Sequence, residues 1–127
     1  MHVVSDRLTR LTRQLDAIEA ELRKLGWWEE APPDLIAAAD RDEIRNFLDV
    51  PSFELWLQAL FLPRAREAVA ANDLPAESQV GQMALRQYDY HSVVPEAAHL
   101  LALLHDFDAL VEGRKPIHRT VASAPVE

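Results

Sequence analysis

Apolar residues recur at intervals of three and four between Leu8 and Leu25, which is the spacing of one face of an α-helix. The positions in this seam are Leu8, Leu11, Leu15, Ile18, Leu22 and Leu25. Ser5 suits the N-cap of such a helix, and Gly26 stands where a left-handed residue commonly ends one. The pattern predicts a long helix whose seam packs on other helices. If those helices leave the seam uncovered, it predicts a homodimer.

Further helical patterns follow, and no segment shows the alternation of a strand. The predicted helices cover residues 33–39, 52–72, 78–88 and 95–113. Residues 40–51 read as a polar connection that carries Phe47 and Leu48 into the core. The sequence therefore predicts an all-α, single-domain helical bundle. It has four main helices, with a short helix in the first long connection. The domain spans residues 1–113, and residues 114–127, rich in Pro, Ala and Val, are expected to form a flexible tail.

The helix predicted at 52–72 is apolar around almost its whole circumference, so other helices should enclose it. A projection at about 100° per residue places Arg64 in the same sector as Phe53 and Leu57. We therefore expect Arg64 to point toward the core and to need a carboxylate or a free carbonyl beside it. Pro63 has no N–H to donate to the carbonyl of Ala59, which predicts a kink with polar groups beside it.

Two interpretations of this helix remain open. In the first, Arg64 forms an internal ion pair that fixes how the helices cross. In the second, Trp56, Gln58 and Arg64 build a pocket or partner site at the break made by Pro63, with Trp28 as a further candidate from the loop after the first helix. The candidate site residues are thus Trp28, Trp56, Gln58, Pro63 and Arg64.

Composition excludes several classes of protein. The 127 residues include no cysteine, which removes disulfides, thiolate metal sites and cysteine nucleophiles. The first residues show no apolar signal segment, and no apolar run approaches the roughly 20 residues that span a bilayer, so we expect a soluble, cytoplasmic protein. A formal charge of −8 argues against direct nucleic-acid binding.

The charges are also unevenly distributed. No Lys or Arg occurs between Gln87 and Gly113, whereas five acidic residues do. This stretch predicts either a solvated acidic face or a docking surface for a basic partner.

The candidate chemical motifs are weak. Glu96 and His99 have the Glu-x-x-His spacing of di-iron bundles, but those sites need a second such pair and two more glutamates. His105 and Asp106 match metal-dependent phosphohydrolases only as a dipeptide. Three scattered glycines cannot form a phosphate-binding loop. We predict no catalytic, metal-binding or cofactor-binding residue, and the pattern leans away from an enzyme without deciding the question.

Several segments together resemble the YqcC-like family of small bacterial proteins. They are residues 18–28, Pro32-Pro33, residues 53–58, Phe61-Leu62-Pro63-Arg64 and Leu74-Pro75. The similarity extends from Leu15 to Leu110, and the segment from Trp56 to Arg64 is its most specific part. This chain departs from the family pattern at Ala59, at Ala65 and in residues 42–49.

The resemblance implies a helical bundle with no established activity, cofactor or catalytic residue. Members of the family are often encoded beside a tRNA pseudouridine synthase. We therefore expect a non-catalytic protein-interaction or accessory module whose partner is a tRNA-modifying enzyme. The alternative is a small-molecule-binding or enzymatic bundle with a pocket near Pro63 and Arg64.

Overall fold

The computed structural model describes residues 3–90 and 94–113 and is all-α over these ranges, with no strand. Its α-helices are α1 (Val3–Lys24), α2 (Leu35–Asp40), α3 (Phe53–Trp56), α4 (Leu62–Ala70), α5 (Val80–Leu85) and α6 (Ala98–Glu112). The predicted helical bundle is confirmed. So is the short helix in the first long connection, which is α2. The predicted tail at 114–127 lies outside the described residues.

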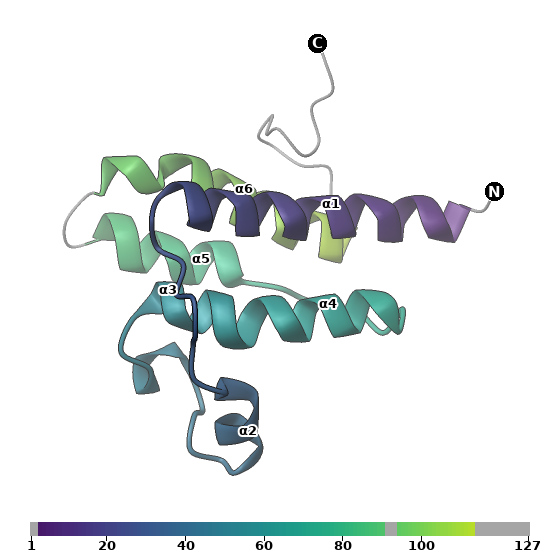
Figure 1. The fold of residues 1–127 in the computed structure, drawn as a ribbon. Coiled ribbons are helices and arrows are strands. Elements are labelled where there is room, and N and C mark those ends of the chain that lie inside the picture. The colour runs from purple at the N-terminus through teal and green to yellow at the C-terminus, as the bar shows by residue number, and fades with distance from the viewer. Residues whose placement is uncertain (1–2, 91–93, 114–127) are drawn as a thin grey trace.

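The first helix, α1, packs on α6 and on α4, and Figure 1 shows α2 on the side of α4 away from α1. Four residues of the predicted seam have no exposed surface: Leu11, Leu15, Ile18 and Leu22. The other helices therefore cover the seam, and the condition under which it predicted a homodimer is not met. Within the part of the chain that the structure describes, no helix is both long enough and apolar enough to cross a membrane.

The helix ends follow their capping chemistry. The Ser52 hydroxyl accepts a hydrogen bond from the Leu55 N–H at 3.1 Å and caps α3. Gly26, just after α1, and Gly113, just after α6, both have positive φ, as left-handed C-terminal residues require. Ser5 does not cap α1, because that helix already begins at Val3.

The helix predicted at 52–72 is continuous through α3, a π-helical segment at Leu57–Phe61, and α4. In the π-helical segment the Leu62 N–H bonds the Leu57 carbonyl, five residues back instead of four. A π turn takes in one extra residue, so everything after it is rotated by about 100° relative to a regular α-helix. The projection of a regular helix did not contain this turn, which changes where Arg64 points.

In the connection between α2 and α3, the neighbours Phe47 and Leu48 differ in burial. Phe47 packs edge-on against Phe53, with ring centroids 5.1 Å apart. Leu48, by contrast, is 77% exposed, so the prediction that it enters the core was wrong. The reason is local: Phe47 and Leu48 are consecutive in the 3₁₀ turn Phe47–Asp49, and three residues per turn set consecutive side chains about 120° apart.

A candidate binding pocket between α4 and α5

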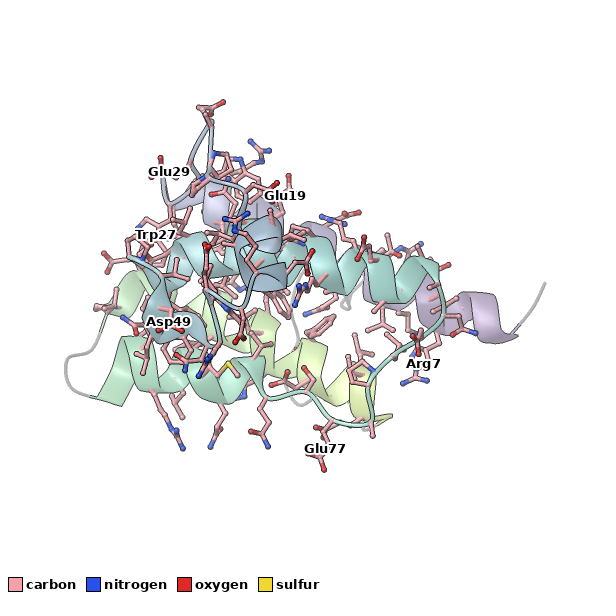
Figure 2. All side chains as sticks on the ribbon, turned by 90° about the horizontal axis from the view of Figure 1, so that it is seen from below. Arg7, Glu19, Trp27, Glu29, Asp49 and Glu77 are labelled. Carbon is pink, nitrogen blue, oxygen red and sulfur yellow. The ribbon has the colours of Figure 1, made fainter. Side chains whose placement is uncertain are left out.

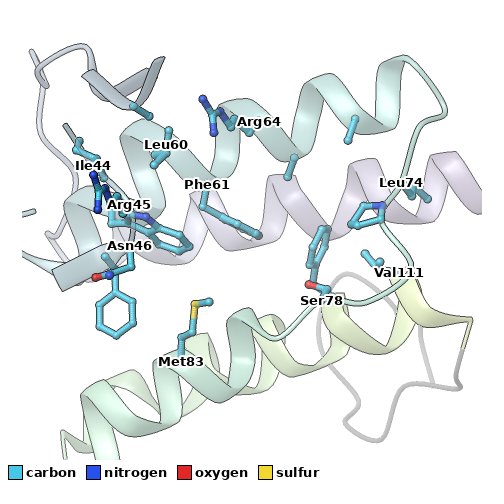
Figure 3. Close-up of a pocket in the computed structure, with 17 residues that line it drawn as sticks. Ile44, Arg45, Asn46, Leu60, Phe61, Arg64, Leu74, Ser78, Met83 and Val111 are labelled. Atoms are coloured by element: carbon cyan, nitrogen blue, oxygen red, sulfur yellow. The ribbon is translucent and has the colours of Figure 1, made fainter. Parts of the chain in front are cut away.

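A pocket of about 400 Å³ lies between α4 and α5, closed at one end by the α4–α5 connection and at the other by residues 44–47. Figure 3 shows Phe61 reaching into it from the helix that continues as α4, and Met83 pointing toward it from α5. Most of its lining is apolar: Ala39, Ile44, Phe47, Trp56, Leu60, Phe61, Ala65, Ala68, Leu74, Pro75, Met83, Phe107 and Val111. Its polar lining residues are Arg45, Asn46, Arg64 and Ser78.

Aromatic rings form the inner wall of the pocket. Trp56 and Phe61 are stacked with their centroids 5.9 Å apart, and Phe61 meets Phe107 of α6 edge-on at 5.4 Å. Trp56 directly precedes the π-helical segment and Phe61 is its last residue, and because a π turn aligns residues five apart, both rings reach one side. The aromatic wall is therefore a product of the π turn.

Arg64 is on the rim of this pocket and not in the core. Its side chain is 48% exposed, and its guanidinium donates a hydrogen bond to the Asp40 carboxylate at 3.2 Å. The prediction of a carboxylate beside Arg64 is confirmed, whereas the prediction that Arg64 points into the core was wrong. The rotation introduced by the π turn explains the difference.

A second arginine, Arg45, also lines the pocket. Arg45 donates to the Asp42 carboxylate at 3.1 Å, and both of these side chains are largely exposed. Arg45 and Arg64 are the charged side chains that line the pocket, while the two aspartates they contact are outside its lining. Each guanidinium that an occupant of the pocket would meet is therefore paired with an exposed aspartate just outside the lining.

Gln58 is buried on another side of the helix and takes no part in the pocket. Its side-chain amide donates to the Glu29 carbonyl at 2.8 Å and accepts from the Glu29 N–H at 2.9 Å. Figure 2 shows Glu29 far from Glu77, which marks the α4–α5 connection. Gln58 therefore pins the loop after α1 onto the central helix, and its interpretation as a pocket residue was wrong.

Trp28 is also absent from the pocket lining. It lies in the loop that Gln58 holds, with the Arg23 guanidinium 4.3 Å from its ring centroid. Pro63 is partly buried and directly follows the π turn, so its missing N–H falls where the regular α-helical hydrogen bonding is already interrupted. Of the five candidates, Trp56 and Arg64 line the pocket, and Pro63 precedes Arg64 in the sequence. Gln58 and Trp28 instead belong to the attachment of the loop after α1.

Asp108 was missed as a site residue in the sequence, where it appeared only as part of an acidic stretch. Its carboxylate is 4% exposed and accepts three hydrogen bonds: from the Ser78 hydroxyl at 2.5 Å, the Val80 N–H at 3.1 Å and the Gly81 N–H at 2.7 Å. It fixes the start of α5 and the Ser78 end of the pocket. Its position among the apolar residues of α6 was the one signal in the sequence that this carboxylate is buried and needs hydrogen-bond donors.

Burial raises the pKa of the Asp108 carboxyl, since desolvation disfavours the charged form, and this outweighs the hydrogen bonds from Ser78, Gly81 and Val80 and the nearby His105. Asp106, its neighbour two residues earlier, is only 1% exposed. Neither aspartate contributes to a solvated acidic face or to a docking surface for a basic partner, so both interpretations of this part of the stretch were wrong.

The pocket lining holds no Asp, Glu, His, Lys or Cys. Its one hydroxyl nucleophile is Ser78, whose hydrogen is donated to Asp108. Nowhere in the described ranges do three His, Asp or Glu side chains gather as a metal site would need. This lining offers a ligand two kinds of interaction: apolar contact with the walls, and hydrogen bonds from the guanidinium and amide groups at the rim.

Fold and site together define a small all-α bundle protein with an apolar, arginine-rimmed pocket on one face. The chain belongs to the DUF446 family, described as tRNA pseudouridine synthase C, whose model matches residues 10–110. No curated protein and no solved structure matches the chain.

Proposed function

We propose that this chain is a non-catalytic interaction module whose pocket receives a large apolar side chain from a protein partner. The observation that carries the proposal is the lining of the pocket: aromatic and aliphatic walls, with no acid or base positioned for chemistry. Buried aromatic and aliphatic anchors supply most of the affinity in protein interfaces, and they bind in pockets of this kind.

The partner we propose is a tRNA pseudouridine synthase, in the cytoplasm. Support comes from the family description and from the resemblance to YqcC-like proteins, which are often encoded beside such an enzyme. The chain carries a formal charge of −8, so contact with tRNA would come from the enzyme and not from this chain. The chain would then act as an accessory protein.

Pairwise calorimetry tests this proposal, with the purified chain and a tRNA pseudouridine synthase from the same source. Ala68→Phe fills the pocket, because Ala68 lines it, and should lower affinity by about a hundredfold, the effect of losing one buried anchor. Ala70→Phe is the matched control, since Ala70 is exposed on the same helix and outside the lining. Absence of binding would reject the partner. Equal binding by both variants would reject the pocket as the docking site.

A second candidate function is the binding of a small amphiphilic molecule. The volume of about 400 Å³ favours it, because pockets that bind small ligands commonly hold about 300–1,000 Å³. Native mass spectrometry of the chain purified from its source would detect a retained molecule. Loss of that molecule in Ala68→Phe, with retention in Ala70→Phe, would place it in the pocket. A chain that carries no molecule would count against this candidate.

A further inference from the structure

An exposed apolar side chain follows a residue of the pocket lining in the sequence. Phe47 lines the pocket, and the next residue, Leu48, is 77% exposed in the same 3₁₀ turn. An exposed large apolar side chain beside an apolar pocket is typical of a surface that another macromolecule covers. A small molecule inside the pocket would leave Leu48 in water, whereas a peptide that extends from the pocket past Phe47 can cover it. This observation favours a polypeptide occupant and rests on the proposed function.

The rim charges indicate the chemistry of that polypeptide. The guanidiniums of Arg45 and Arg64 each contact one aspartate, and both of these aspartates are at least 70% exposed. Exposed ion pairs of this kind contribute about 0–1 kcal/mol, so an incoming carboxylate can replace either aspartate at small cost. Guanidinium groups also bind carboxylates through two parallel hydrogen bonds, which gives them directional specificity.

The overall charge of −8 does not reverse this preference. Charges in water are screened beyond about 8 Å at physiological salt, and the two arginines are the charged side chains of the lining itself, so an occupant of the pocket contacts their guanidiniums directly. Two of the acidic residues that suggested a basic partner, Asp106 and Asp108, are buried and contribute little to the outer surface.

We propose that the pocket recognises an acidic peptide segment, in which one bulky aromatic or aliphatic side chain enters between Phe61 and Met83 and flanking carboxylates bind Arg45 and Arg64. Leu48 packs against the part of the segment that remains outside the pocket. The acidic residues in this segment set its affinity and orientation, and the apolar side chain provides the anchor.

Selection from a random peptide display library tests the proposal and requires no purified partner protein. The library is selected in parallel on the unmodified chain and on the double variant Arg45→Glu, Arg64→Glu. Both arginines are on the surface, so circular dichroism and thermal unfolding of the variant should match those of the unmodified chain. The readout is the charge of the enriched peptides and their affinity by fluorescence anisotropy.

We expect the unmodified chain to enrich peptides with an aromatic or leucine anchor and neighbouring Asp or Glu, and the double variant to enrich Lys or Arg instead. An acidic peptide selected on the unmodified chain should bind the double variant about tenfold more weakly, because two attractive contacts become repulsive. Asp40→Asn should strengthen its binding about twofold by releasing Arg64. All of these differences should shrink at high salt.

The possible outcomes separate this inference from the proposed function. Peptides that bind the unmodified chain and fail to bind Ala68→Phe, but show no enrichment of acidic residues, would overturn the charge preference and leave pocket docking intact. Peptides that bind Ala68→Phe as well as the unmodified chain would overturn both. Recovery of no peptide at all would also overturn both and would favour the small-molecule candidate.

Discussion

Two regions of this bundle, the α1–α6 interface and the space between α4 and α5, differ in how completely they are packed. Between α1 and α6, Leu15 and Leu104 have no exposed surface, and even the buried Gln14 is satisfied by donating to the Leu103 carbonyl at 2.8 Å. Between α4 and α5, the apolar side chains of Phe61 and Met83 border a pocket of about 400 Å³.

The difference lies in how the helices are joined and held. At one end of the α1–α6 pair, the Arg7 guanidinium donates to the Leu110 and Val111 carbonyls at the C-terminal end of α6. The start of α5 is instead held on α6 by Asp108, and the α4–α5 connection then crosses the end of the pocket. The α1–α6 interface is thus closed, whereas the α4–α5 side keeps a pocket.

The largest expected effect contrasts the two regions directly. Leu15→Ala should lower the free energy of unfolding by about 4 kcal/mol, because it leaves a cavity in a closed interface. Met83→Ala should cost only about 1 kcal/mol, because that side chain already faces open volume. Urea unfolding followed by circular dichroism measures both. Equal costs would show that the α4–α5 face is packed as tightly as the α1–α6 face.

The next largest decrease in the free energy of unfolding is expected from removal of the Asp108 carboxylate. Asp108→Ala leaves the Ser78 hydroxyl and the Val80 and Gly81 N–H groups without their acceptor, and should cost about 3 kcal/mol in unfolding free energy. The exposed Asp73 provides the control, and Asp73→Ala should change stability by less than about 0.5 kcal/mol. Similar values for the two variants would mean that Asp108 does not hold α5.

Gln58→Ala separates the loop attachment from the pocket. It removes both hydrogen bonds to the Glu29 backbone and should cost about 2 kcal/mol, with peptide binding unchanged. The exposed Gln82 serves as control through Gln82→Ala. Denaturant unfolding and fluorescence anisotropy are read together. A loss of peptide affinity at unchanged stability would show that Gln58 contributes to binding at the pocket.

The smallest effect concerns Tyr88, which packs on Trp27 and donates to the Glu54 carboxylate at 2.6 Å. Burial, and then the Glu54 carboxylate, raise the pKa of Tyr88 above its ordinary value of 10.0, so the folded chain keeps a proton that the unfolded chain releases. The stability that depends on this proton is complete below about pH 10 and is lost as the pH rises toward the folded pKa.

Unfolding free energies at about pH 9 and about pH 11 should therefore differ by about 1.4 kcal/mol more in the unmodified chain than in Tyr88→Phe. Tyr88→Phe removes the titrating group and keeps the ring. Equal differences in the two proteins would show that Tyr88 ionises alike in the folded and unfolded states.

Sequence periodicity predicted the parts of this fold that local physics determines. The seam of α1 follows from spacing alone, and the helix ends at Ser52, Gly26 and Gly113 follow from capping chemistry. These features depend on residues close together in the chain, so one sequence contains all the information needed to find them.

The candidate site could be predicted only in part, because it depends on one irregular turn and on distant contacts. The π turn at Leu57–Phe61 rotates Arg64 out of the core, and a projection that assumes a regular helix cannot include it. Gln58 and Asp108 acquire their roles from Glu29 and Ser78, which are 29 and 30 residues away. The residue types signalled polar sites, but their partners were set by the tertiary fold.

Hydrogen–deuterium exchange on the complex tests the central claim that the α4–α5 pocket is the docking site. The chain is measured alone and with its bound partner, either the tRNA pseudouridine synthase or a selected peptide. We expect slower exchange in residues 44–48, 60–68 and 80–85, and no change along α1. Slower exchange confined to α1, with the pocket residues unchanged, would contradict the account.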